Sequence, residues 1–182
     1  FYTGNCHKWM MTPKGSAFLF ARAEAQRLIG PLVVSWGNKS KPDSPFVQEL
    51  EFLWTKDIAA YLSFHAGFQF MDQYEWPKVR IKCHELTRNF RAGMTDITGL
   101  QPVVPDSPRF FSQMSAHPLP PCNGPELQRR LYDDYKIEVP VNQRESDFFL
   151  RISVQGYNSQ SDVDHLLSAV ADLLSDKSLR MP

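Results

Sequence analysis

Near its start the chain reads Gly4-Asn5-Cys6-His7-Lys8-Trp9 and then Thr12-Pro13-Lys14-Gly15-Ser16. The residues before this stretch have the character of a strand, and the apolar run over residues 16–21 predicts a second, buried strand. Strand ends that face a crevice are where α/β proteins bind ligands. A lysine held there among aromatic and polar neighbours can lose its proton and attack a carbonyl group. Lys8 is therefore a candidate nucleophile, and the alternative is a solvated surface lysine.

Strands and helices alternate along the rest of the chain. Apolar and β-branched runs predict strands over residues 32–36, 110–115, 137–141 and 148–154. Apolar residues three and four positions apart predict helices over residues 23–28, 57–71, 125–135, from Pro77 to near Gly93, and from residue 161 onward. Residues 37–45 have loop composition, and the seven prolines between residues 99 and 125 exclude a long helix there. The alternation predicts an α/β or α+β layer architecture.

The composition excludes several classes of protein. Lys plus Arg (20) equals Asp plus Glu (20), and this zero formal net charge argues against a nucleic-acid binder. No run approaches about 18 apolar residues, so no membrane span is expected, and no signal peptide is visible. The three cysteines, Cys6, Cys83 and Cys122, show no metal-binding spacing, which predicts structural thiols, no metal site and a cytoplasmic location.

Several blocks of sequence, in order, resemble one known family. They are Asn5-Cys6-His7-Lys8-Trp9 with Pro13-Lys14-Gly15-Ser16-Ala17-Phe18-Leu19, then Pro31-Leu32-Val33-Val34-Ser35-Trp36-Gly37, Asp57-Ile58-Ala59-Ala60-Tyr61-Leu62, and Arg151-Ile152-Ser153 with Tyr157-Asn158 and Asp162-Val163-Asp164. Together they resemble class V aminotransferase-fold enzymes that depend on pyridoxal phosphate (PLP), most of all the isopenicillin N epimerase-like branch. The resemblance covers almost the whole chain.

The resemblance implies roles for individual residues. Lys8 matches the lysine that holds PLP covalently and moves the proton at the substrate alpha carbon. His7 and Asn5 match positions beside the cofactor phosphate. Thr55 matches a threonine that reaches the phosphate of the neighbouring subunit, which implies a homodimer. Arg151 matches the arginine that binds the alpha-carboxylate of an amino-acid-like substrate, a task that suits its guanidinium fork.

The residues themselves leave alternatives open. His7 is either a phosphate ligand or a half-buried structural histidine. Arg151 follows an apolar run, where an unpaired buried charge is costly, so it either faces a cleft that receives an anion or lies exposed on an edge strand. Trp54 precedes Thr55 where the family has a glycine that lets the backbone approach a phosphate.

The fold that the resemblance implies is the C-terminal part of the PLP-dependent type I (aspartate aminotransferase-like) fold. Residues 1–75 would end the large PLP-binding domain, and residues 76–182 would form the connecting helix and a small α/β domain with an antiparallel sheet. The groups that face the cofactor ring precede the lysine in this family. The chain is therefore expected to be a fragment of a longer enzyme or a truncated relative.

The family performs several reactions at the alpha carbon: epimerisation, C–S bond cleavage and transamination. Sulfur transfer through a thiol is disfavoured, because no cysteine lies between Tyr135 and Arg151 and Cys122 lies well upstream. The sequence thus predicts a PLP-dependent enzyme of the epimerase, lyase or transferase type. The alternative is a non-catalytic dimerisation module of the same fold.

Overall fold

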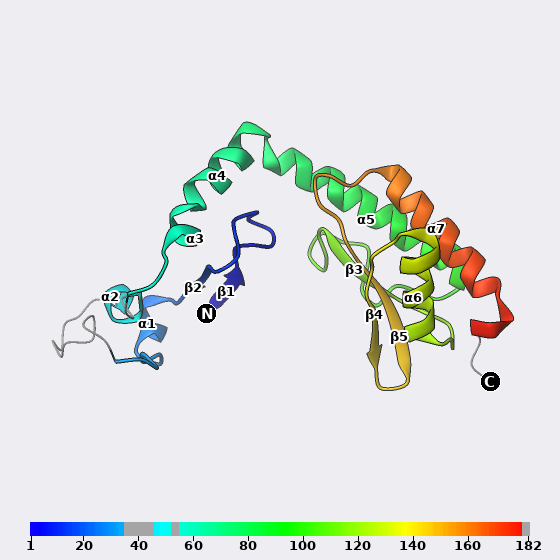
Figure 1. The fold of residues 1–182 in the computed structure, drawn as a ribbon, viewed down its shortest axis with the longest axis horizontal. Helices are drawn as coiled ribbons and strands as arrows, with labels where there is room; N and C mark the ends of the chain where they lie inside the picture. Colours follow the sequence, from blue (N-terminus) through cyan, green and yellow to red (C-terminus); the bar gives the residue numbers. More distant parts are fainter. Residues whose placement is uncertain (35–45, 52–54, 180–182) are drawn as a thin grey trace. The chain divides into compact units, whose positions relative to one another are not determined.

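The computed structural model describes residues 1–34, 46–51 and 55–179, and the chain divides into two compact units, Phe1–Tyr74 and Glu75–Pro182 (Figure 1). Unit 1 contains β1 (Tyr2–Asn5), β2 (Ala17–Phe20), α1 (Ala23–Gln26), α2 (Phe46–Glu51), α3 (Ala59–Leu62) and α4 (Phe64–Gln73). Unit 2 contains α5 (Trp76–Thr98), β3 (Met114–Pro118), α6 (Gly124–Tyr135), β4 (Val141–Arg144), β5 (Asp147–Ser153), α7 (Gln160–Ser175) and η2 (Lys177–Leu179). The assignment of the two parts to a large cofactor-binding domain and a small domain stays a prediction.

The first two strands of unit 1 form an antiparallel hairpin that runs from the pair Tyr2 and Phe20 to the pair Asn5 and Ala17. The strand predicted over residues 16–21 is therefore present, but it is not buried: Leu19 is 46% exposed and Phe20 58% exposed. The helices of unit 1 contain no buried residue within the described part of the chain. Within the described part of unit 1, few residues pack over the apolar side chains, which would favour burial.

One prediction for unit 1 is wrong in its described part. Residues 32–34 form a bend instead of the start of a strand. The remainder of that predicted strand, the loop predicted over residues 37–45, and Trp54 lie outside the described residues.

The helix predicted over residues 57–71 is split into α3 and α4 at Ser63, whose hydroxyl donates to the carbonyl oxygen of Ala60 at 2.7 Å. At the start of α3, the side chain of Asp57 accepts a hydrogen bond from the backbone N–H of Ala59 at 2.8 Å. A Cβ atom on Gly67 would lie 2.9 Å from the carbonyl oxygen of Met10. Glycine at this position therefore lets α4 lie directly against the loop that follows β1.

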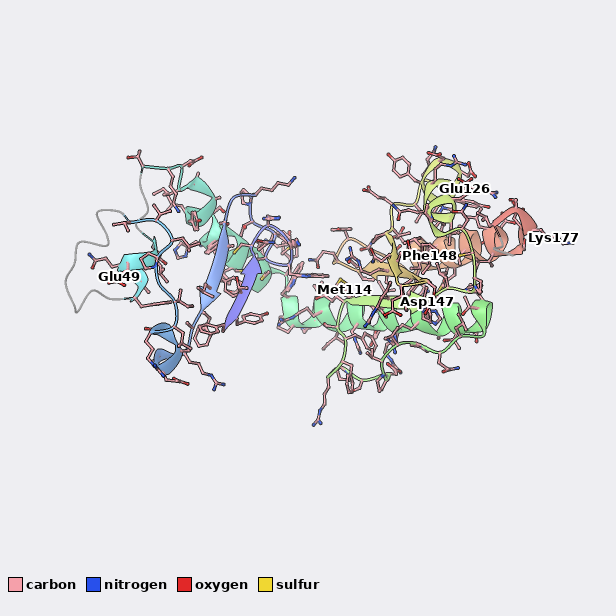
Figure 2. The ribbon with its side chains drawn as sticks, turned by 90° about the horizontal axis from the view of Figure 1, so that it is seen from below. Glu49, Met114, Glu126, Asp147, Phe148 and Lys177 are labelled. Atoms are coloured by element: carbon pink, nitrogen blue, oxygen red, sulfur yellow. The ribbon has the colours of Figure 1, made fainter. Side chains whose placement is uncertain are left out.

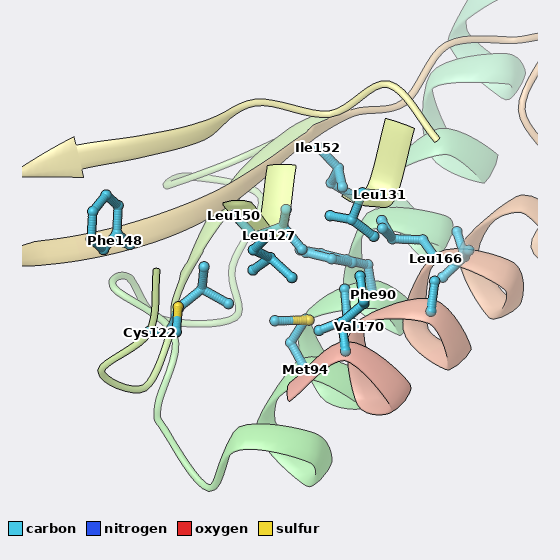
Figure 3. Packing of buried hydrophobic residues seen from close by; sticks show 14 of the residues in the cluster. Phe90, Met94, Cys122, Leu127, Leu131, Phe148, Leu150, Ile152, Leu166 and Val170 are labelled. Carbon is cyan, nitrogen blue, oxygen red and sulfur yellow. The ribbon is translucent and has the colours of Figure 1, made fainter. Parts of the chain in front are cut away.

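Unit 2 is built on a three-stranded antiparallel sheet in the order β3-β5-β4, with β5 in the centre. Side chains alternate along β5: Phe148, Leu150 and Ile152 are buried in the core, whereas Phe149 and Arg151 are only half-buried. Figure 3 shows the buried side chains of β5 packing with residues of α5, α6 and α7, and Phe90 and Met94 of α5 are fully buried there. The helices therefore cover one face of the sheet, and Arg151 belongs to the other face.

The predicted apolar face of α5 is present, since Cys83 and Phe90 are buried and Val79 and Leu86 pack against the core. The predicted end near Gly93 is wrong, because α5 continues to Thr98 and ends at Gly99 with φ 71°. A Cβ atom on Gly93 would lie 2.4 Å from Cδ1 of Leu167 in α7. This glycine therefore permits close helix packing and does not end the helix.

Two strands of unit 2 begin later than predicted. Residues 107–111 form a turn, in which the N–H of Phe110 donates to the carbonyl oxygen of Ser107 at 3.0 Å, so β3 starts only at Met114 (Figure 2). β4 starts at Val141, after Pro140. The helices predicted over residues 125–135 and from 161 onward are confirmed as α6 and α7. No helix in the described ranges is long and apolar enough to cross a bilayer.

Candidate functional site

Three of the predicted site residues lie on or beside the loop between β1 and β2. Cys6, which is fully buried, anchors the loop: its N–H donates to the carbonyl oxygen of Ser16 at 3.1 Å, and its carbonyl oxygen accepts from Thr12 at 3.3 Å. A turn follows, in which the N–H of Lys8 donates to the carbonyl oxygen of Asn5 at 3.4 Å. The loop that carries His7 and Lys8 is therefore closed by backbone hydrogen bonds, Asn5 lies at its start, and the side chain of Lys8 is exposed.

His7 is half-buried, and its Nδ1 atom is buried without a hydrogen-bond partner. The hydroxyl of Ser16, at the other end of the same loop, is also buried and unpartnered. Buried polar atoms are nearly always hydrogen-bonded in folded proteins. An oxygen-rich ligand, such as the phosphate of PLP, could therefore form hydrogen bonds with both atoms. Ser16 was not among the predicted site residues, and only its place in the motif could have pointed to it.

Thr55 lies in the same unit but not on this loop. It is exposed in the segment just before α3. Within the described residues Thr55 forms no hydrogen bond to the loop that carries Lys8, so its role at the phosphate stays a prediction.

Arg151 lies in unit 2, on the central strand of the sheet. It is the register partner of Ala116 on β3, and its N–H donates to the carbonyl oxygen of Pro140 at 3.1 Å. The interpretation as an edge-strand arginine is therefore wrong, because β5 has a strand on each side. The side chain is half-buried, and its Nε atom is buried without a partner. A small residue opposite a guanidinium with a free buried donor suits an anion-binding position.

The cysteines of unit 2 are structural. Cys83 and Cys122 are each 2% exposed, and desolvation by burial raises the pKa of both thiols. A buried thiol of raised pKa is a poor nucleophile. The expectation that sulfur is not transferred through Cys122 stays a prediction. No group of three metal-ligating side chains occurs within the described ranges.

The architecture matches solved structures of one fold. Cysteine desulfurase CsdA of Escherichia coli superposes with a TM-score of 0.74 at 20% identity, over 96% of this chain and 46% of that chain. A C-DES mutant with glycine covalently linked to its PLP cofactor gives a TM-score of 0.67 at 16% identity, over 92% of this chain and 44% of that chain. The chain therefore has the C-terminal part of the PLP-dependent type I, aspartate aminotransferase-like fold, and this prediction is confirmed.

The sequence is similar to two kinds of curated protein. Isopenicillin N epimerase of Amycolatopsis lactamdurans is 29% identical over 185 residues, which are 95% of this chain and 46% of that protein. Probable L-cysteine desulfhydrase, chloroplastic, of Arabidopsis thaliana is 28% identical over 198 residues, which are 97% of this chain and 40% of that protein. No family model matches the chain. The resemblance to the isopenicillin N epimerase-like branch of the class V fold is confirmed, and the chain spans less than half the length of these relatives.

Proposed function

We propose that the protein is a PLP-dependent enzyme that acts at the alpha carbon of an amino acid or aminoacyl compound, with Lys8 as the residue that holds the cofactor. The observation that carries the proposal is the buried, unpartnered Nδ1 of His7 directly beside Lys8. Buried polar atoms rarely stay without a partner. A phosphate bound by the Lys8 loop would satisfy this atom and the hydroxyl of Ser16.

The residues of unit 1 divide the work at the cofactor. His7 and Asn5 would hold the phosphate, and Thr55 would reach the phosphate of a second subunit in a homodimer. Lys8 would take the proton from the alpha carbon and could return it to the face on which the lysine lies. When bound, PLP supplies the electron sink that stabilises negative charge at the alpha carbon.

Arg151 would bind and orient the substrate through its alpha-carboxylate. Its Nε is buried without a partner, and a carboxylate accepts two parallel hydrogen bonds from a guanidinium. A charge-assisted pair at a half-buried position fixes the substrate, so the alpha carbon has one orientation. The similar proteins favour epimerisation or C–S bond cleavage over transamination, and the buried Cys122 argues against sulfur transfer through a thiol. A cytoplasmic location remains part of the proposal.

Reductive trapping tests the assignment of Lys8. The protein, expressed in full from its gene, is incubated with PLP and reduced with borohydride, and the labelled peptide is identified by mass spectrometry. Label is expected on the peptide that carries Lys8, and Lys8→Ala is expected to remove it. Lys14→Ala is the matched control, because Lys14 is an exposed lysine of the same loop. Label retained at full yield in Lys8→Ala, or lost in Lys14→Ala, would contradict the proposal.

A second candidate function is a non-catalytic dimerisation module. One observation favours it: unit 1 leaves large apolar side chains such as Leu19 and Phe20 exposed. This candidate predicts that the 182-residue chain associates with itself and gives no spectral change when PLP is added. Sedimentation and absorption spectroscopy on the same sample distinguish the two, because stoichiometric cofactor binding by the chain alone would exclude the module.

A further inference from the structure

Unit 2 contains a groove of about 620 Å³ between the second half of α5 and the segment that follows this helix. Arg88, Arg91 and Thr95 line it from the helix. Residues 101–106 line the other side, with the apolar run Pro102-Val103-Val104-Pro105. The groove is therefore apolar along one wall and carries cationic and hydroxyl groups on the other.

Arg91 is the unusual residue of this groove, because it is a buried cation with neutral partners. It is 3% exposed. Its Nη1 donates to the hydroxyl of Ser115 at 3.2 Å, its Nη2 donates to the carbonyl oxygen of Val104 at 2.5 Å, and its guanidinium carbon lies 4.1 Å from the ring centroid of Phe111. Within the described residues Arg91 forms no ion pair. Burial of a cation without an anion is costly, and desolvation lowers the pKa of Arg91.

The nearest carboxylate, Asp106, attracts Arg91 electrostatically but forms no ion pair with it within the described residues. Asp106 is already paired with Arg88, whose Nε lies 3.0 Å from Oδ1 and 2.9 Å from Oδ2 and whose Nη2 lies 2.7 Å from Oδ2. Asp96 also lines the groove, but it is exposed to water and forms no ion pair with Arg91 in the described part of the chain. The charge of Arg91 is thus only partly compensated, and the two aspartates disfavour anions of higher charge.

We propose that this groove binds a small organic monoanion, a carboxylate with an apolar body, and that Arg91 pairs with its charge. A guanidinium has five N–H donors, and the hydrogen bonds to Ser115 and Val104 use two of them. The carboxylate meets Arg91 and the hydroxyl side of the groove, and the apolar body lies against Val103 and its proline neighbours. The anion offsets the cost of the buried cation.

The groove and Arg151 lie on opposite faces of the sheet. Ser115, which accepts from Arg91, is buried on the face covered by α5, whereas its neighbour Ala116 is the register partner of Arg151. Successive residues of a strand point to opposite faces. A ligand of the groove therefore does not share contacts with a carboxylate at Arg151, and the inference does not rest on the proposed function.

Calorimetric titration of the full protein tests the inference with three probes: 3-methylbutanoate, 3-methylbutylamine and inorganic phosphate. The carboxylate is expected to bind with a Kd on the order of 1 mM or tighter, and the amine and phosphate at least about tenfold more weakly. Absence of carboxylate binding, or equal binding of amine or phosphate, overturns the proposal.

Variants at the rim locate the site without removing a buried residue. Val103 is 61% exposed, so substitutions there leave the fold intact. Val103→Asp is expected to weaken carboxylate binding about tenfold and Val103→Arg to tighten it, whereas the neutral Val103→Asn changes it less than about threefold. Arg151→Gln removes any carboxylate binding at Arg151 itself, and the binding that remains in this variant is assigned to the groove. Equal affinity in Val103→Asp and Val103→Arg, or loss of binding in Arg151→Gln alone, overturns the assignment to this groove.

Discussion

Replacement of Gly93 by alanine has two opposing effects on the free energy of unfolding: a gain in helix preference and a steric clash with α7. Alanine in a helix interior is more favourable than glycine by about 1 kcal/mol. The new Cβ atom, however, would lie 2.4 Å from Cδ1 of Leu167, 2.9 Å from its Cδ2 and 3.2 Å from its Cγ. All three distances are below ordinary carbon contact, so Leu167 or the whole of α7 must move.

The steric effect is expected to win. Overpacking of this kind costs about 1–3 kcal/mol, so Gly93→Ala should lower the free energy of unfolding by up to about 2 kcal/mol. Leu167→Ala removes all three contacted atoms. In that background Gly93→Ala should instead raise the free energy of unfolding by about 1 kcal/mol, because only the helix preference remains.

Urea unfolding of the wild type, the two single variants and the double variant measures how the sign of the Gly93→Ala effect on unfolding free energy depends on Leu167. Hydrogen exchange of the α5 amides shows that the change in stability is in unit 2. Ala92→Gly provides the control, because Ala92 is an exposed neighbour on the same helix and reports the helix preference without contact to α7. A stabilising effect of Gly93→Ala in the presence of Leu167 would refute the packing argument. So would the same sign in both backgrounds.

Two further predictions concern unit 2. Ser159 and Asp162 form a capping box at the start of α7, so Ser159→Ala should cost about 1 kcal/mol of unfolding free energy in urea denaturation. Ser168→Ala, at an exposed position in the interior of the same helix, is the control, and equal losses would contradict the role of the cap. Burial lowers the pKa of His117, which is fully buried with its Nε2 3.3 Å from the hydroxyl of Thr95. His117 therefore binds a proton more readily in the unfolded state than in the folded state, and the free energy of unfolding should fall as the pH drops below the ordinary histidine pKa of 6.5. His117→Gln should flatten this part of the stability profile. An unchanged profile would exclude His117 as the cause.

Much of the fold was predictable because local signals and burial agree in unit 2. The apolar stripe of α7 and the alternation of β5 each face one core, so periodicity identified both elements. The predicted ends of helices and strands were wrong where tertiary contacts determine those ends. Gly93 looks like a helix end in sequence, but its meaning depends on Leu167, which lies 74 positions further along the chain and is invisible to local patterns.

Unit 1 was predicted less well for a related reason. The run that forms β2 is apolar enough to suggest burial, yet Leu19 and Phe20 stay exposed, because burial depends on which surfaces cover a strand and not on its own composition. The types of the site residues came from a resemblance to a family. The surroundings of these residues could not be predicted from the sequence. Neither the unpartnered hydroxyl of Ser16 nor the neutral hydrogen-bond partners of Arg91 leave a pattern in the sequence.

The unpartnered polar atoms bear directly on the proposed function. In the described part of the chain, three buried side-chain atoms have no hydrogen-bond partner: Nδ1 of His7, Oγ of Ser16 and Nε of Arg151. Two of the three belong to residues that the resemblance had already placed at a phosphate or a carboxylate, and the third ends the same loop as Lys8. An unsatisfied buried donor costs about 1–3 kcal/mol, and a bound anion would remove this cost. Unpartnered atoms at positions that the resemblance assigns to a phosphate and a carboxylate support the proposed binding roles of His7 and Arg151, and they favour the enzyme over the dimerisation module.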